Sequence, residues 1–356
     1  GVEDPIMAAR LDYDGKLPGS MGRAKTVNAW LELLEDGTIR VLSGKVELGQ
    51  GIRTAIQQVA AEELDMDLKK VQVHLAETGV TPNEGYTGAS ASIQNSAMSV
   101  RYAAATARQE LLLLASKKLN TAVDNLLLYN GLVKSKQNKE SLTFAEILDG
   151  EQIEKEVMLP IPIKDNREHR YVGKAIPRPD IEEMVRGQST YIQDLRFPGM
   201  VHARVVRPPG YTSQLISLDD TGLKSEVSGI IKTVRKGSFV GVITEREYQA
   251  VKAEQYLKDH SIWTAPIPFP KSENLYAHIK LIASSPETVK NEGDVAAAFE
   301  GTKTLKATYT KPYIKHASMG PACGIAMFDG EILHIWSHSQ GIYPMREALA
   351  TMLNME

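Results

Sequence analysis

Two glycines flank a glutamine at Gly49-Gln50-Gly51, the first segment whose residue types could do chemistry. The triplet follows an expected strand at 46–48 and precedes an expected helix, and glycine lets a backbone pass close to a ligand. Free N–H groups at a helix start can receive an anion such as a phosphate, and the Gln50 amide both donates and accepts hydrogen bonds. A tight strand-to-helix turn also explains both glycines without any ligand, so both interpretations stay open.

A second loop, at 86–92, precedes a long expected helix and carries small and hydroxyl-bearing residues. These are Thr87, Gly88, Ala89, Ser90 and Ser92. Bare backbone and hydroxyls at a helix start can hold a pyrophosphate. Alternatively, Ser90 or Ser92 caps the helix that begins at Ile93, and both roles can coexist. Neither loop has the G-x-G-x-x-G or P-loop pattern, so a Rossmann or Walker site is not predicted.

Three histidines, His316, His334 and His338, lie in the last part of the chain. His334 and His338 are not on an expected helix and lack the one-face spacing of an H-E-x-x-H site. His334 alternates with Trp336 along an expected strand, which places both on one face. We interpret these histidines as structural or surface residues and predict no metal site. No motif surrounds Cys323, so it is not a predicted nucleophile.

The elements that must position these residues follow from hydrophobic periodicity. Alternating apolar residues predict strands and i, i+3, i+4 spacing predicts helices. Strands are expected at 27–33, at 39–41 after an Asp36-Gly37 hairpin turn, and at 71–75, 202–206, 229–234, 239–244, 305–309, 322–327 and 332–336. Helices are expected around 56–64, at 93–118, 121–129 and 247–257, and from 344 to the end.

Composition limits the class of protein. The chain has 356 residues, with 41 basic and 44 acidic side chains and a formal net charge of −3, which argues against a nucleic-acid binder. One cysteine excludes an intrachain disulfide and any all-cysteine metal or iron–sulfur site within the chain. No apolar run reaches the length of a membrane span. Composition shifts and prolines divide the chain into a lead-in at 1–24, a first unit at 25–150, an extended linker at 151–185, a second unit at 186–265 and a third at 266–356.

Several separated motifs resemble one family, the molybdenum-binding subunits of the xanthine dehydrogenase/aldehyde oxidase family. They are Lys45–Gly51 (KVELGQG), Ala60–Leu64 (AAEEL), Thr81–Gln94 (TPNEGYTGASASIQ), Gly187–Pro208, His316–Pro321 and Trp336–Gly341. The glutamine–glycine segment precedes the part that resembles the family's hammerhead domain. That order is similar to the isoquinoline 1-oxidoreductase and nicotinate dehydrogenase-like branch.

The resemblance implies an α+β fold in which cofactor-binding α/β units flank an aldehyde oxidase/xanthine dehydrogenase a/b hammerhead domain. It implies an oxidoreductase that carries molybdenum–molybdopterin, in its cytosine dinucleotide form. This enzyme would hydroxylate an N-heterocycle or an aldehyde with oxygen derived from water. Electrons would pass to a small [2Fe–2S] subunit, which agrees with the single cysteine of this chain.

The resemblance also assigns roles to residues. Gln50 and Gly51 would contact the pterin or the dinucleotide, and Ala89 would lie near the molybdenum. Phosphates would go to Thr87, Gly88, Ser90 and Ser92. Gln340 and the segment around His316 would approach the cofactor or the substrate funnel from the opposite side.

Departures from the family pattern limit these expectations. Ile314 and Gly320 stand where many relatives have a glutamine and a glutamate, and the glycine-rich loop and the segment with the general-base glutamate are absent. No catalytic residue is therefore predicted in this chain. Glu47 and Glu84 lie near the motifs, and we expect a surface or capping role for each.

The chain has roughly half the length of a usual subunit of this family. The implied partners are therefore the C-terminal half of the molybdenum subunit, the [2Fe–2S] subunit and a cytochrome c electron acceptor. The branch also implies a periplasmic location, with the cytoplasm as the alternative. A different class of function stays open: a cofactor-free fragment or assembly partner without activity of its own.

Overall fold

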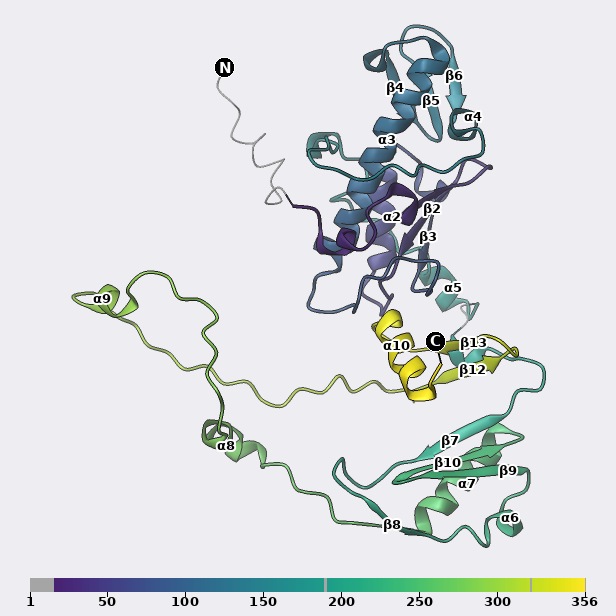
Figure 1. Cartoon of the computed structure of the whole chain (residues 1–356), viewed down its shortest axis with the longest axis vertical. Helices are drawn as coiled ribbons and strands as arrows, with labels where there is room; N and C mark the ends of the chain where they lie inside the picture. The colour runs from purple at the N-terminus through teal and green to yellow at the C-terminus, as the bar shows by residue number, and fades with distance from the viewer. Residues whose placement is uncertain (1–15, 189–190, 321, 356) are drawn as a thin grey trace. The chain divides into compact units, whose positions relative to one another are not determined.

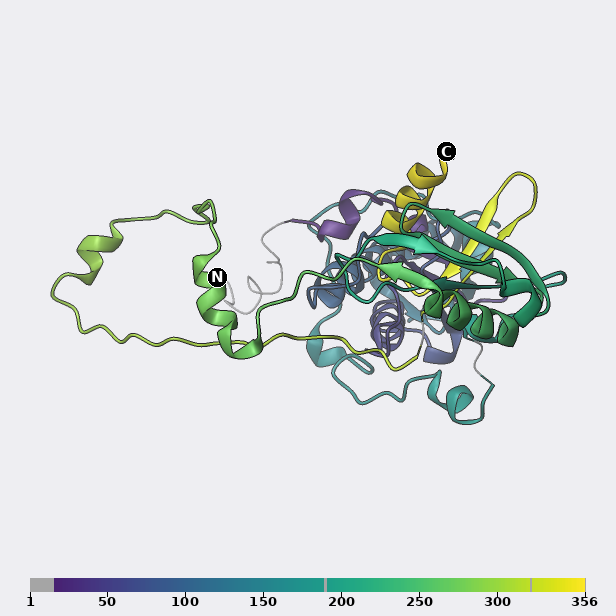
Figure 2. The same ribbon diagram turned by 90° about the horizontal axis from the view of Figure 1, so that it is seen from below.

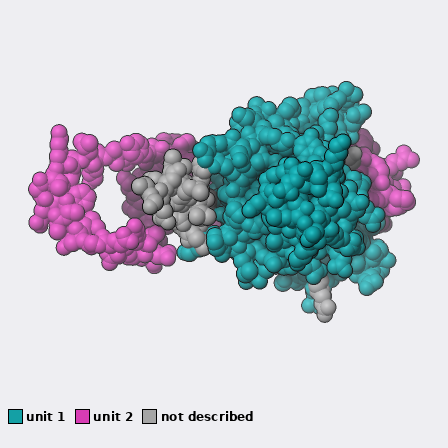
Figure 3. All heavy atoms as spheres, turned by 90° about the horizontal axis from the view of Figure 1, so that it is seen from above, with its two compact units in different colours: residues 1–193, 323–356 teal, residues 194–322 magenta. Residues whose placement is uncertain are grey.

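The computed structural model describes residues 16–188, 191–320 and 322–355. The chain divides into two compact units (Figure 3), of which unit 1 comprises residues 1–193 and 323–356 and unit 2 comprises residues 194–322. Both units contain helices and strands, which confirms the expected mixture of α and β structure. The domain boundaries and the hammerhead assignment stay predictions.

The first sheet of unit 1 has three strands in the order β1-β2-β3. β1 (Leu31–Leu33) and β2 (Ile39–Ser43) are antiparallel around a turn in which Gly37 has a φ of 78°, which confirms the predicted hairpin. β3 (Val71–Leu75) runs parallel to β2. A parallel pair needs a crossover connection, and helix α2 (Ile52–Glu63) provides it.

A long helix packs beside α2. It begins with a π-helical turn at Ile93–Ala97 and continues as α3 (Met98–Leu119), so the predicted helix at 93–118 is confirmed. The sheet and the two helices bury one apolar core. Its fully buried side chains include Trp30, Leu31, Ile39, Ile56, Leu64 and Leu111. This core fixes the end of β2 and the starts of α2 and of the long helix. The two predicted binding loops lie directly before these helix starts.

A second small sheet contacts the C-terminal part of α3 (Figure 1). It consists of β4 (Leu126–Tyr129), β5 (Leu132–Ser135) and β6 (Ser141–Thr143), all antiparallel, followed by α4 (Phe144–Leu148). The Thr143 hydroxyl accepts a hydrogen bond from the Glu146 N–H, and the Glu146 carboxylate accepts one from the Thr143 N–H in return. This capping box starts α4.

The proline-containing segment at 151–185 is extended, but it is packed onto unit 1. Ile153, Val157 and Ile161 are buried in the core of that unit. The segment ends in α5 (Ile181–Val185). These buried apolar residues are spaced four apart. The prediction of a linker rested on the prolines and did not take this spacing into account.

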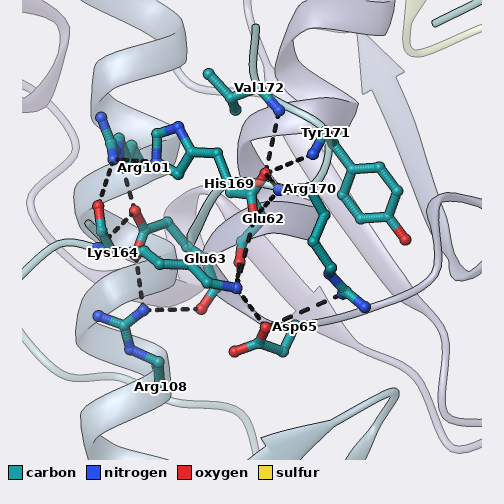
Figure 4. A network of polar contacts seen from close by, with 10 residues as sticks. All are labelled: Glu62, Glu63, Asp65, Arg101, Arg108, Lys164, His169, Arg170, Tyr171 and Val172. Atoms are coloured by element: carbon teal, nitrogen blue, oxygen red, sulfur yellow. Dashed lines mark hydrogen bonds and ion pairs between the residues drawn. The ribbon is translucent and has the colours of Figure 1, made fainter. Parts of the chain in front are cut away.

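Two adjacent buried carboxylates of α2 hold the middle of this segment (Figure 4). Glu62 accepts backbone N–H bonds from Arg170, Tyr171 and Val172 at 2.7–3.1 Å. Glu63 accepts hydrogen bonds from the side chains of Arg101 and Arg108 and from the Lys164 N–H. Lys164 also places its ammonium beside Glu62 at 3.4 Å. Each buried charge is thus paired and hydrogen-bonded, which is the condition for burying it.

Unit 2 has its own sheet and core. The sheet order is β7-β10-β9, all antiparallel, and helix α7 packs against the sheet (Figures 1 and 2). The strands are β7 (His202–Val206), β8 (Leu215–Leu218), β9 (Ile230–Lys236), β10 (Phe239–Thr244) and β11 (Ser261–Trp263), and the helices are α6 (Leu223–Glu226), α7 (Glu247–Asp259), α8 (Leu275–Leu281) and α9 (Val295–Phe299). β8 pairs with β11. The predicted strands at 202–206, 229–234 and 239–244 and the helix at 247–257 are confirmed.

The last part of the chain returns to unit 1. β12 (Gly324–Phe328) and β13 (Leu333–Ser337) form an antiparallel hairpin, and α10 (Ile342–Leu353) follows. These elements confirm the strands expected at 322–327 and 332–336 and the terminal helix. They also bring the predicted residue Gln340 into unit 1.

Several expected elements are wrong or shorter than predicted. The helix at 121–129 is replaced by a 3-10 turn at Val123–Asn125 and by β4, along which buried and exposed residues alternate with a period of two. The strand at 27–33 is reduced to β1, since residues 27–29 form a 3-10 turn. Residues 305–309 form no strand, and Leu305 and Tyr309 are almost fully exposed, so they have no buried face to pair.

Candidate functional site

A cavity of about 310 Å³ in unit 1 gathers residues from three separate segments of the chain. It is lined by Leu48, Gln50, Gly51, Ile52, Ala55, Thr87, Gly88, Ser90, Ser92, Ile93 and Gln340. Seven of the eight predicted cofactor-binding residues are in this lining. The eighth, Ala89, is exposed and does not line the cavity.

The first loop reaches the cavity as irregular backbone. No strand forms at 46–48, because the Val46 N–H donates to the Thr87 hydroxyl at 2.9 Å instead of to a neighbouring strand. Gly51 has a φ of 82° and is the N-cap residue of α2. The Gln50 amide folds back on its own loop, where it accepts from the Leu48 N–H at 2.6 Å and donates to the Val46 carbonyl at 2.9 Å. Gln50 thus holds the loop in shape.

Glu47 occupies the start of α2. Its carboxylate accepts hydrogen bonds from the N–H groups of Gly49, Gly51 and Arg53 at 2.8, 2.9 and 3.1 Å. The expected capping role of Glu47 is confirmed. The expectation that these N–H groups are free for a phosphate is wrong, because the chain's own carboxylate already binds them.

The second loop keeps its polar groups available. Ala89 and Ser90 are both left-handed, with φ values of 54° and 55°, a conformation that costs energy in residues with a side chain. Neither serine caps the helix: Ser92 makes no side-chain bond to it, and the hydroxyls of Ser90 and Ser92 have no hydrogen-bond partner among the described residues. The capping interpretation is therefore wrong.

Gly88 adds a second indication that this loop faces a ligand. A Cβ atom built there meets no protein atom within 4 Å. Packing within the protein therefore does not require a glycine at this position. The open space at Gly88, beside the two unpaired hydroxyls, would let a bound group come close to the backbone.

The third segment is joined to the second loop by hydrogen bonds. The Thr87 N–H donates to the Gln340 carbonyl at 2.7 Å, and the Gln340 amide donates to the Thr87 carbonyl at 2.8 Å. Tyr343 on α10 accepts from the Gly79 N–H at 3.1 Å and donates to the Thr81 carbonyl. These bonds place Gln340 at the cavity by direct contact.

Arg178 is a residue near the first loop that the sequence analysis did not single out. Its guanidinium donates to the Gly49 carbonyl at 2.8 Å and pairs with the Asp180 carboxylate. The hydrogen bonds between them raise the pKa of Arg178 and hold the pKa of Asp180 below its ordinary value. Arg178 lies 127 positions beyond Gly51, and no local pattern points to this contact.

Two of the three predicted histidines, His334 and His338, have hydrogen-bond partners in unit 1. His334 contacts Asp329 at 3.0 Å, and its ring stacks near that of Trp336, which confirms their shared face. Hydrogen bonds from the N–H groups of Ile332 and Glu331, together with His334, lower the pKa of Asp329 to about 2.

The remaining candidates for metal or nucleophilic chemistry are dispersed. His338 contacts the Cys323 carbonyl at 2.9 Å, and His316 is exposed in unit 2. The described residues contain no group of three or more histidine, cysteine or acidic side chains placed to hold a metal ion. None of the described helices is both long enough and apolar enough to cross a membrane.

Two regions of the chain match models of a known kind of domain. Residues 15–172 and residues 280–356 each match a molybdopterin cofactor-binding domain. The chain carries molybdenum-cofactor-binding domains of the xanthine dehydrogenase family. The family is one of oxidoreductases, as the resemblance implied.

Named relatives agree with this assignment. A nicotinate dehydrogenase subunit of Pseudomonas putida is 35% identical over 91% of this chain, and the beta subunit of isoquinoline 1-oxidoreductase from Brevundimonas diminuta is 28% identical over 65%. The matches cover 28% and 34% of those two proteins, so the matched part of this chain spans about a third of their length. Among solved structures, quinoline 2-oxidoreductase from Pseudomonas putida 86 matches 33% of this chain and 15% of its own at 23% identity and a TM-score of 0.29.

Proposed function

We propose that this chain forms part of the cofactor-binding region of a molybdenum hydroxylase large subunit. The hydroxylase would oxidise an N-heterocycle or an aldehyde with oxygen derived from water. The observation that carries the proposal is that seven predicted residues line one cavity: Gln50, Gly51, Thr87, Gly88, Ser90, Ser92 and Gln340. These residues belong to the segments that resemble the family's cofactor-binding motifs.

The polar groups of the cavity fit a phosphate-bearing cofactor, with one change from the sequence-based expectation. Ser90 and Ser92 offer unpaired hydroxyls beside the open space at Gly88, so phosphates would bind there. The Glu47 carboxylate would repel an anion at the start of α2. Leu48 and Ile52 offer apolar contact to a ring system.

The bound cofactor would supply the oxygen-transfer chemistry, and this chain would bind and orient it. We propose the cytosine dinucleotide form of molybdopterin, with Ala89 near the molybdenum. The general-base glutamate would come from outside this chain, because no carboxylate lines the cavity among the described residues.

The wider assembly is part of the same proposal. The two relatives are each named as one subunit of an enzyme. By analogy, this chain would work with the C-terminal half of the molybdenum subunit, a [2Fe–2S] subunit and a cytochrome c acceptor, in the periplasm. Residues 186–265 would form the a/b hammerhead domain between the two cofactor-binding regions.

The test compares two glycine substitutions in the complete subunit, produced together with its iron–sulfur partner. Gly88→Val fills the open space in the cavity, whereas Gly22→Val fills similarly open space away from it. Molybdenum is counted per polypeptide by mass spectrometry, and the nucleotide released by acid is identified. We expect molybdenum in the unmodified protein and about a tenfold loss in Gly88→Val, a typical scale for disturbing the surroundings of a bound metal.

The outcomes separate the interpretations. Normal molybdenum content in Gly22→Val, with equal melting temperatures for both variants, would assign the loss to the cavity. An unmodified protein that contains no molybdenum and oxidises no N-heterocycle or aldehyde would overturn the proposed function. It would favour the cofactor-free fragment instead.

A further inference from the structure

Two buried charged side chains lie behind the cavity without lining it. Lys45 is 3% exposed and Glu84 is 9% exposed. The expectation of a surface or capping role for Glu84 is therefore wrong. Burying a charge is costly unless bonds compensate, so the partners of these two residues indicate what they do.

Lys45 holds the backbone that leads into the second loop. Its ammonium donates to the carbonyls of Glu84 at 3.0 Å and Tyr86 at 2.9 Å. The next residue, Val46, donates its N–H to the Thr87 hydroxyl at 2.9 Å. Two consecutive residues that lead into the first loop thus bind the chain at the start of the second.

Glu84 joins the two ends of the second loop to β2. Its Oε2 atom accepts from the Ser43 hydroxyl at 2.7 Å, the Gly44 N–H at 2.9 Å and the Ser96 hydroxyl at 3.0 Å. Ser43 ends β2, and Ser96 lies in the π-helical turn that follows the loop. One carboxylate oxygen therefore fixes the distance between the strand end and the helix start.

Burying these two charged groups carries an energetic cost. The Oε1 atom of Glu84 is buried and has no hydrogen-bond partner among the described residues. Burial lowers the pKa of Lys45, and the Glu84 charge opposes that shift. Neither side chain lines the cavity. The hydrogen bonds of their charged groups go instead to backbone groups and serine hydroxyls around the two loops.

We propose that Lys45 and Glu84 are positioning residues that hold the 86–92 loop in its binding shape before the cofactor arrives. The inference rests on the proposed function only for the identity of the ligand. A preformed loop avoids the entropy loss of ordering it on binding. Lys45 and Glu84 would thus act on cofactor affinity through the loop, without touching the cofactor.

The first experiment needs no cofactor. Hydrogen exchange is measured across 86–92 in the full chain for Lys45→Met and for Lys164→Met. Lys164 is a matched control, because its side chain is only 9% exposed, pairs with Glu62 and Asp65 in unit 1, and does not line the cavity. We expect exchange in the loop to rise about tenfold or more in Lys45→Met, which removes the bonds to the Glu84 and Tyr86 carbonyls at the start of the loop, and to change little in Lys164→Met.

The second experiment measures molybdenum per polypeptide in the complete subunit produced with its partner. Glu84→Gln is measured in both experiments, so that the proposal stays testable if Lys45→Met does not fold. This substitution keeps the shape of the side chain and one acceptor oxygen. We expect lower molybdenum content in Lys45→Met and Glu84→Gln than in Lys164→Met at equal folded fraction.

Equal loop exchange and equal molybdenum content in the Lys45 and Lys164 variants would overturn the positioning role. Full molybdenum content with unchanged loop exchange in Glu84→Gln would overturn it as well. An unmodified subunit without molybdenum would instead reject the proposed function, while the exchange experiment would still decide whether Lys45 orders the loop.

Discussion

Glu47 decides where in the cavity wall an anion can bind. A helix start attracts anions through its unpaired N–H groups, and two helices begin near the cavity. At α2 the N–H groups of Gly49, Gly51 and Arg53 are bound by Glu47, whereas no side chain caps the π-helical turn that begins α3. A single residue thus directs the proposed phosphates toward Ser90 and Ser92.

Glu47→Ala should lower the free energy of unfolding by roughly 1 kcal/mol, the usual cost of losing a helix cap. The reason is that three N–H groups lose their acceptor at once. Urea unfolding checks the value, with Glu35→Ala as the control. Glu35 is exposed at a hairpin turn, so its substitution should stay within about 0.5 kcal/mol. Equal effects of the two substitutions would contradict the capping role.

At the scale of elements, the segment at 162–172 depends on α2 for its place. Burial alone would raise the pKa of Glu62. The N–H bonds from Tyr171, Arg170 and Val172 and the charge of Lys164 outweigh burial and lower that pKa (Figure 4). A carboxylate with a lowered pKa stabilises the fold at pH values above its ordinary pKa, and this contribution disappears as the pH falls.

Glu62→Gln should therefore change how the free energy of unfolding depends on pH in acidic solution. The unmodified chain should lose stability as the pH falls below the ordinary pKa of 4.5, because protonating Glu62 removes the acceptor charge. The variant should be less stable at pH 7 by about 3 kcal/mol, since it leaves Lys164 and three N–H groups poorly paired. The free energy of unfolding of the variant should fall less steeply below pH 4.5 than that of the unmodified chain.

Urea unfolding at about pH 7, 5, 4 and 3 measures both the loss of stability at pH 7 and its dependence on pH. The three lower values are about one pH unit apart and cover the titration range of a glutamate. Glu140→Gln serves as the control, because this exposed glutamate bonds only to its own turn. A Glu62→Gln curve parallel to that of the unmodified chain would show that Glu62 does not set the acid sensitivity.

Local patterns singled out the two loops of the cavity, because the small and hydroxyl-bearing residues of each loop are neighbours in the sequence. Gln340 was predicted only through the family resemblance. The buried contacts behind the cavity were not predicted. Lys45 and Glu84 lie about 40 positions apart in the sequence, and only folding shows that both are buried. Arg178 contacts Gly49 across an even longer separation. A charged residue carries no local signal of burial, so these roles could not be predicted from the sequence.

At the scale of the whole molecule, the two units have separate hydrophobic cores. The core of unit 1 includes Leu111 on α3, and the core of unit 2 includes Leu257 on α7. No buried residue is shared between these two clusters of described residues. Each unit therefore gains its stability from its own burial of apolar side chains.

Separate cores predict separate unfolding. Leu111→Ala and Leu257→Ala each remove a fully buried side chain of equal size, and each should cost about 2–5 kcal/mol in its own unit. Differential scanning calorimetry of the full chain should show two transitions, with each substitution lowering the midpoint of only one. Because the two variants differ only in the core they disturb, each serves as the control for the other. If either substitution lowered both midpoints equally, the two units would unfold as one cooperative body, and the loops around the cavity would then depend on the stability of unit 2 as well.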